Sequence, residues 1–235
     1  MTVVLAASAA RELPASEQAE RWAQCLLGRE VREPMLRVWT DTCPTLILGR
    51  GQKEDDALAA RADSREMAVV HRLSGGGAVL AGPWLLCSIA VLPPRHPLVL
   101  PSIPDSFRWA GYAHADWLGG LGIPATCKLP ATVQSDRSMA WACFGNTASW
   151  EVEADGRKIV GLAQARSGNG VILASAVLVE PAPWALLCEV MGKWIGYATL
   201  LSQHTASCAQ FIHAPLPAHA LEGSLLEALE RAVAG

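Results

Sequence analysis

The sequence predicts a fold of mixed α and β structure, and three observations support this class. Helical periodicity with recognisable ends marks the segments 16–27, 105–121, 184–191 and 218–232. Short apolar or alternating runs of strand length occur at 36–40, 44–50, 67–73, 85–92 and 171–179. The pair Asp155-Gly156 separates two alternating runs, which predicts a tight β-hairpin over 149–165.

The first helix is expected to begin at Ser16, whose side chain can cap the first turn, with Trp22, Cys25 and Leu26 on one face. After the apolar strand 85–92 comes a proline-rich loop, Pro93–Pro104, and loops of this length often act as lids.

The helix that follows this loop should end at Gly122. Its candidate core residues are Phe107, Ala110, Ala113 and Leu118. Further short strands are expected near 125–129 and 139–144.

Composition limits the class of protein. The chain has 235 residues, 51% of them hydrophobic and 17% charged, so a sizeable core is expected and long disorder is not. The net charge of −3, without a basic stripe, disfavours a nucleic-acid partner. No apolar run reaches the length of a membrane helix, and residues 1–10 suit a first strand better than a signal peptide. A cytoplasmic protein without a membrane partner is therefore expected.

Seven cysteines are scattered without a Cys-x-x-Cys pair or a tight Cys/His cluster, at positions 25, 43, 87, 127, 143, 188 and 208. This spacing indicates neither a metal site nor a disulfide framework. Most of these cysteines are expected to be small buried core residues.

The predicted hairpin gives Lys158 an unusual setting. Two-fold alternation places Lys158, Val160, Leu162 and Gln164 on one face of the outgoing strand. An ammonium group beside apolar residues suits the wall of a cleft that binds a ligand with an acyl chain and an anionic group. The alternative is a surface ion pair with Glu153 across the hairpin, which would contribute about 0–1 kcal/mol.

A glycine-rich loop is the second candidate site. Gly75, Gly76 and Gly77 follow a strand-like run, and such a loop can point several backbone N–H groups at a phosphate or carboxylate. Arg72 beside it would add a forked donor. The spacing matches neither a P-loop nor a dinucleotide-binding fingerprint. A plain flexible turn is the alternative.

Together the two segments resemble a known family. Arg72-Leu73-Ser74-Gly75-Gly76-Gly77-Ala78-Val79, followed about eighty residues later by Gly156-Arg157-Lys158-Ile159-Val160-Gly161-Leu162-Ala163-Gln164, is similar to the lipoate-protein ligase A and octanoyltransferase family, which is related to biotin protein ligase. Residues 34–40 and 44–52 look like the family's first two strands. The resemblance implies an α+β fold with a central, largely antiparallel mixed sheet flanked by helices. It also implies one catalytic domain over 1–235 that lacks the C-terminal accessory domain of two-domain ligases.

The resemblance implies transfer of an octanoyl or lipoyl group to a lysine of a lipoyl carrier domain or a glycine-cleavage H-like protein. A transferase would take the group from an octanoyl carrier protein without a cofactor, whereas a ligase would use free lipoate, ATP and Mg²⁺. Lys158 matches the family lysine that contacts the acyl carbonyl. The implied substrate-binding residues are Arg72, Ser74, Gly75, Gly76, Gly77, Ala78, Val79, Val160, Gly161 and Leu162.

Cys143 bears on the choice between these activities. Cys143-Phe144, followed by Ser149-Trp150-Glu151-Val152, resembles the segment of cysteine-dependent octanoyltransferases in which the cysteine carries the acyl group. A buried core cysteine is the alternative.

Other features disagree with that assignment. The three consecutive glycines are the ligase-like form of the loop. Two family histidines are replaced, one at Ala81 and one in Ala174-Ser175-Ala176, while His71 occupies a usual arginine position.

Three hypotheses remain. The first is an acyltransferase with Cys143 as nucleophile and Lys158 as electrostatic stabiliser. The second is an ATP-dependent lipoate-protein ligase, alone or with a separate accessory subunit, in which Cys143 is inert. The third is a pseudoenzyme that binds an acyl group or adenylate without turnover.

Overall fold

The computed structural model describes residues 12–133, 136–212 and 216–235. Its larger sheet has six strands, each antiparallel to its neighbours. In spatial order these are β1 (Met35–Trp39), β5 (Leu85–Leu92), β9 (Val171–Leu178), β8 (Arg157–Arg166), β7 (Val152–Ala154) and β6 (Ala125–Cys127).

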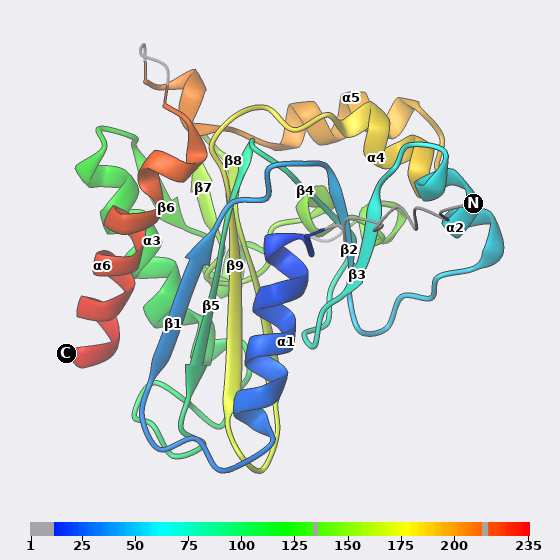
Figure 1. Cartoon of the computed structure of the whole chain (residues 1–235). Helices are drawn as coiled ribbons and strands as arrows, with labels where there is room; N and C mark the ends of the chain where they lie inside the picture. The colour runs from blue at the N-terminus through cyan, green and yellow to red at the C-terminus, as the bar shows by residue number, and fades with distance from the viewer. Residues whose placement is uncertain (1–11, 134–135, 213–215) are drawn as a thin grey trace, which may run out of the picture.

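A three-stranded sheet lies beside it (Figure 1). Its central strand β2 (Thr45–Leu48) pairs in parallel with β3 (Ala68–His71) and antiparallel with β4 (Val79–Ala81). The α-helices are α1 (Ala15–Leu27), α2 (Asp56–Asp63), α3 (Arg108–Gly120), α4 (Trp184–Val190), α5 (Gly196–His204) and α6 (Glu222–Ala234). The α+β class and the largely antiparallel mixed sheet are therefore confirmed.

Helices cover both faces of the large sheet (Figure 1), and each face has a core. Successive residues of a strand point to opposite faces, so β5 sends Cys87 and Ile89 into a first core with α1 and the small sheet. It sends Leu86 into a second core that α3 and α6 cover. The two faces therefore present different environments to side chains from the same strands.

The segment 139–144 is not the predicted strand. It forms turns and short 3₁₀ helices, including one over Cys143–Gly145, with a single bridge between Ala78 and Ala142. The elements α2, β4 and α5 were not predicted. For α2, the cap is clear in the structure, since the Asp55 carboxylate accepts from the Leu58 N–H at 2.7 Å. The strand expected within residues 1–10 lies outside the described residues.

The first helix is also set differently from the prediction. It begins at Ala15, and Ser16 does not cap it; the Ser16 hydroxyl and N–H instead bond to the buried Asp41 carboxylate. Ser16, Ala19 and Ala23 form its buried face, and Cys25 is exposed. Small residues allow this helix to approach the sheet closely.

The cysteines are all free, and the expectation that most are buried is wrong. Cys87, Cys188 and Cys208 are buried, whereas Cys127 and Cys143 are partly exposed and the other two are exposed. No helix among the described residues is long and apolar enough to cross a membrane.

Candidate active site

The predicted hairpin is present. Asp155 and Gly156 both have positive φ, 56° and 70°, as the two central residues of a type I′ turn require. Lys158 lies opposite Glu153, as expected from a two-residue turn. Their charges do not pair, however, because Glu153 contacts Lys128 at 3.2 Å.

A β-bulge changes the direction of the Lys158 side chain. The register of β7 against β8 shifts after Lys158, which leaves Ile159 without a direct partner. An ideal Cβ on Gly161 would lie 3.6 Å from the Lys158 Nζ, so Lys158 is on the Gly161 side of the strand. Val160 and Leu162 lie in the second core. The predicted common face for Lys158, Val160 and Leu162 is therefore wrong.

Lys158 is buried, with 2% of its surface exposed, and its ammonium group is fully engaged. Nζ lies 2.6 Å from a Glu151 carboxylate oxygen and donates to the carbonyl oxygens of Cys143 at 2.6 Å and Asn146 at 2.8 Å. It also lies 5.3 Å from the Phe144 ring centroid. Since an ammonium group has three donors, all are used in holding the segment that carries Cys143.

Glu151 completes this network. Its carboxylate accepts from the Leu162 N–H at 2.9 Å and the Ala148 N–H at 2.7 Å, besides pairing with Lys158. A buried ion pair is tolerated when further hydrogen bonds satisfy both ions, and that condition is met here. The sequence contains Glu151 within the Cys143 segment, but nothing in the pattern shows that it, rather than Glu153, is the partner of Lys158.

The glycine loop is held from its inner side. Arg72 is buried and donates to the carbonyl oxygens of Gly75 and Gly77, each at 2.8 Å. With the carbonyls turned inward, the N–H groups of Gly75, Gly76 and Gly77 make no hydrogen bond within the described part of the chain. The guanidinium of Arg72 thus shapes the loop, and the free N–H groups can receive an anionic oxygen.

The loop and the Cys143 segment are joined through their backbones. The Ala78 N–H donates to the Trp141 carbonyl at 2.7 Å, and the Cys143 N–H donates to the Ala78 carbonyl at 2.9 Å. A Cβ on Gly77 would lie 2.5 Å from the carbonyl carbon of Ala142, so a larger residue would force the two segments apart. The structure therefore brings together the glycine loop, Cys143 and Lys158.

The Cys143 thiol lies within this assembly. An ideal Cβ on Gly161 would be 3.1 Å from the Cys143 Sγ, so the absence of a side chain there leaves room beside the sulfur. Burial raises the pKa of the Cys127 thiol to about 11 and that of Cys208 to about 12, and it raises the pKa of Cys87 well above its usual range. Cys143 is partly exposed, and its Sγ lies with the Lys158 Nζ on the Gly161 side of β8.

Three further predicted site residues are buried. Ala78 and Val79 are buried in the first core, and the Ser74 hydroxyl is buried without a partner among the described residues. Of the positions where family histidines are replaced, Ala81 is buried in the same core and Ala174 is partly exposed. His71 is exposed and lies 3.2 Å from Glu54.

A buried histidine that the sequence did not single out lies on the other face of the sheet. His114 on α3 contacts the Ser175 hydroxyl at 2.9 Å and the Ala110 carbonyl at 2.7 Å, and Ser175 contacts Ser88 at 2.6 Å. Burial lowers the pKa of His114 to about 4, so the imidazole is neutral at pH 7. From the sequence alone, a single histidine in an apolar helix does not indicate hydrogen bonds to serines of distant strands.

The family model described as the lipoyl protein ligase A/B catalytic domain matches residues 17–195. The chain belongs to this family. Its resemblance to lipoate-protein ligase A and octanoyltransferases is thereby confirmed, and the matched range contains the glycine loop, Cys143 and Lys158.

Within the lipoyl protein ligase A/B family, the chain is 34% identical to an octanoyltransferase LipM of Moorella thermoacetica over 149 residues, 62% of this chain and 53% of the relative. It is 29% identical to an octanoyltransferase LipM of Kyrpidia tusciae over 210 residues, 85% of this chain and 76% of the relative. The chain spans about half the length of most of the curated relatives it matches.

Among solved structures, a bi-partite lipoate protein ligase from Thermoplasma acidophilum, described together with its E2 lipoyl domain, matches with a TM-score of 0.62 and 17% identity. The match covers 92% of this chain and 80% of the other. This likeness shows that the two chains share a fold.

Proposed function

We propose that this chain transfers an octanoyl group to a lysine of a lipoyl carrier domain through a thioester on Cys143. The observation that carries the proposal is the position of the Cys143 thiol, beside Gly161 and Lys158 and bonded through its backbone to the glycine loop. The octanoyltransferase names of the relatives support the same reaction.

The chemistry has two steps. In the first, the Cys143 sulfur attacks the carbonyl of an octanoyl carrier thioester; a new C–S bond forms, and the carrier thiol leaves with the proton that Cys143 loses. In the second, a neutral lysine amine of the acceptor attacks the Cys143 thioester, which forms an amide and returns a proton to Cys143. Neither step requires an oxidant, a nucleotide or a metal ion.

Both steps place negative charge on the acyl oxygen, and donors fixed in advance stabilise such charge. We assign this role to the N–H groups of Gly75 and Gly76, two exposed residues whose N–H groups make no hydrogen bond within the described residues. Lys158 has no donor left for substrate, so we assign it a positioning role: it fixes the carbonyls of Cys143 and Asn146, and thereby the thiol.

A strip of small residues beside Cys143 suits the alkyl chain. Gly161, Ala163 and Ala165 of β8 point to the first-core face, next to Ala174 of β9. The three alanines are partly exposed, although they lie on central strands. We place the octanoyl chain along this strip, whereas Val160 and Leu162 face the opposite core.

Intact mass measurement tests the proposal. The protein is incubated with an octanoyl carrier thioester, with and without a lipoyl carrier domain. An octanoyl adduct on the enzyme is expected, followed by transfer to the acceptor, and both should disappear in Cys143→Ala. Cys127→Ala is the matched control, since Cys127 is also partly exposed and is not bonded to the glycine loop.

Two outcomes would decide against the proposal. Modification of the acceptor that requires lipoate, ATP and Mg²⁺ and survives Cys143→Ala would identify a ligase. Failure to modify the acceptor under either condition, together with stabilisation by octanoate or lipoate, would identify a binding protein without turnover.

A further inference from the structure

Trp194 and Ile195 are the two most exposed large apolar side chains in the described part of the chain, at 70% and 59%. They lie in the turn between α4 and α5. The Trp194 and Tyr197 ring centroids are 5.8 Å apart, and the Tyr197 and Trp141 centroids are also 5.8 Å apart, both pairs edge to face. This aromatic ladder of Trp194, Tyr197 and Trp141 connects an exposed turn with the segment that carries Cys143.

The outer end of the ladder is held in place. A Cβ on Gly196 would overlap the Trp194 ring, so the ring lies against the backbone of that glycine. The turn thus exposes a large aromatic surface while fixing its position. Exposed apolar surface of this kind marks interaction sites in soluble proteins.

The inner end of the ladder is close to the nucleophile. Trp141 precedes Cys143 by two residues, so their Cα atoms are at most about 7.6 Å apart. A lysine side chain extends roughly 6 Å from its Cα. An acceptor whose lysine attacks a thioester on Cys143 therefore brings its own backbone close to the segment 141–143. A donor whose acyl group is carried on a long flexible arm is free of this constraint.

Three cations belong to segments that contact Trp141. The Lys193 Nζ lies 5.8 Å from the Trp141 ring centroid. Arg50 and Lys53 are exposed and flank Gln52, whose amide donates to the Trp141 carbonyl at 3.0 Å. None of these three cations takes part in an ion pair within residues 12–133, 136–212 and 216–235.

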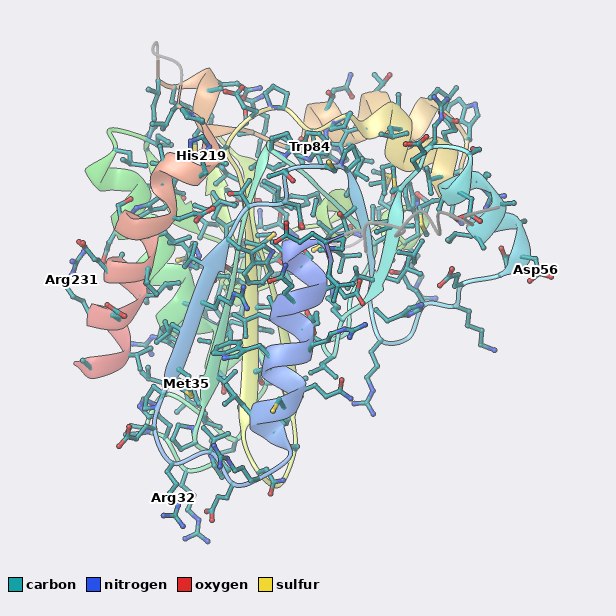
Figure 2. The ribbon with its side chains drawn as sticks, in the orientation of Figure 1. Arg32, Met35, Asp56, Trp84, His219 and Arg231 are labelled. Carbon is teal, nitrogen blue, oxygen red and sulfur yellow. The ribbon has the colours of Figure 1, made fainter. Side chains whose placement is uncertain are left out.

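Of the three acidic residues that follow Lys53, two are engaged elsewhere. Glu54 lies 3.2 Å from the His71 ring, and Asp55 caps α2. Asp56 projects outward from the edge of the molecule (Figure 2). We call three cations the basic rim of the ladder's inner end: Lys193, beside the Trp141 ring, and Arg50 and Lys53, in the segment that bonds to the Trp141 carbonyl.

We propose that the aromatic ladder and its basic rim are the docking surface for the acceptor, a folded lipoyl carrier domain with acidic side chains beside its target lysine. The inference rests on the proposed transfer through Cys143. A central aromatic residue with a charged rim is the usual composition of a transient interface, in which tryptophan contributes much of the affinity and charge raises the association rate.

Single-turnover transfer tests this docking surface. Enzyme loaded with octanoate on Cys143 is mixed with increasing lipoyl carrier domain, and acceptor modification is followed by intact mass. Trp194→Ala should raise the acceptor concentration at half-maximal rate by about 10- to 30-fold, with a nearly unchanged maximal rate. Lys53→Glu and 0.5 M NaCl should raise the same concentration severalfold.

Met35→Ala is the matched control, since Met35 is a 40% exposed apolar residue at the other end of the large sheet from α4 and α5 (Figures 1 and 2). It should leave transfer unchanged. The rate at which hydroxylamine removes the octanoyl group from Cys143, as octanoyl hydroxamate, should be equal in wild type and Trp194→Ala, because hydroxylamine needs no docking surface.

Three results would overturn the inference. Transfer by Trp194→Ala at the wild-type half-saturation would show that the acceptor docks elsewhere. If Trp194→Ala slowed the reaction with hydroxylamine as much as it slowed transfer to the acceptor, the ladder would only support the Cys143 segment. A wild-type dimer that Trp194→Ala dissociates in sedimentation would assign the surface to a second copy of the chain. If no octanoyl adduct forms, the proposed function fails, and the docking surface is then tested by titrating the unloaded chain into labelled lipoyl carrier domain.

Discussion

Lys158 and His114 are both buried polar side chains on the large sheet, but they lie on opposite faces. Lys158 is charged and is held by one carboxylate and two backbone carbonyls, all from the segment 143–151. His114 is neutral at pH 7 and ends a chain of two serine hydroxyls under α3. The first cluster fixes an irregular segment, whereas the second joins regular elements that also pack through apolar side chains.

The difference shows where a buried charge is useful. An irregular segment lacks ladder hydrogen bonds, so its carbonyls need donors, and a single ammonium group can serve several at once. Strands β5 and β9 already satisfy their own backbones, so a neutral hydroxyl chain is sufficient beside them. The comparison therefore predicts unequal costs when each cluster is disrupted.

Lys158→Met should have the largest effect. It leaves Glu151 charged and buried without a cation, and breaking such a pair costs about 3–5 kcal/mol of unfolding free energy. The proposed octanoyl transfer should also be lost, because the Cys143 segment loses its anchor. Urea unfolding and the mass assay measure the two effects.

The double variant Lys158→Met/Glu151→Gln separates stability from positioning. It removes the uncompensated charge, so much of the unfolding free energy should return, while transfer should stay low. If transfer returned with stability, the positioning role of Lys158 would be wrong.

Acid should destabilise the protein through His114. Its pKa in the folded chain is about 4, below the ordinary value of 6.5, so the unfolded chain binds the proton more readily. Stability from this group is complete above pH 6.5 and falls as the pH drops towards 4, by about 3 kcal/mol. Urea unfolding from pH 7 to 4 should show this loss in wild type but not in His114→Gln. His219→Gln, at an exposed position (Figure 2), should keep the wild-type slope.

Ser175→Ala should cost about 1–3 kcal/mol, because the buried His114 ring nitrogen loses its hydroxyl partner. Ser202→Ala on the exposed side of α5 is the matched control and should change stability by less than about 0.5 kcal/mol. The midpoint of urea unfolding at pH 7 measures both. An unchanged free energy of unfolding in Ser175→Ala would mean that the hydrogen bonds of His114, Ser175 and Ser88 add nothing to the packing of α3.

Much of the fold could be predicted because local patterns specify it. The Asp155-Gly156 turn requires positive φ, and the apolar run 85–92 forms β5 with the predicted ends. The glycine loop and Lys158 were identified from adjacent residues. Their contact with Cys143 depends on a fold that brings distant segments together.

What could not be predicted depends on tertiary contacts. The bulge at Ile159 reverses the alternation that would place Lys158 with Val160, and no residue type marks it. Because of that bulge, the Lys158 ammonium group pairs with Glu151 and not with Glu153. Ser16 could cap a helix by its type, but the buried Asp41 takes its hydroxyl instead.

Glu153→Gln should have the smallest effect, and it tests the comparison most directly. Glu153 is the partner that regular alternation assigns to Lys158, yet in the structure it pairs with Lys128, with 15% and 25% of the two side chains exposed. A pair in contact with water contributes less than about 1 kcal/mol, and 0.5 M NaCl should reduce that further. Glu151→Gln should cost several times more and respond little to salt, because its pair with Lys158 is buried. Equal costs in urea unfolding would show that Glu153 holds the Lys158 charge in solution, and the bulge would then not set the direction of Lys158.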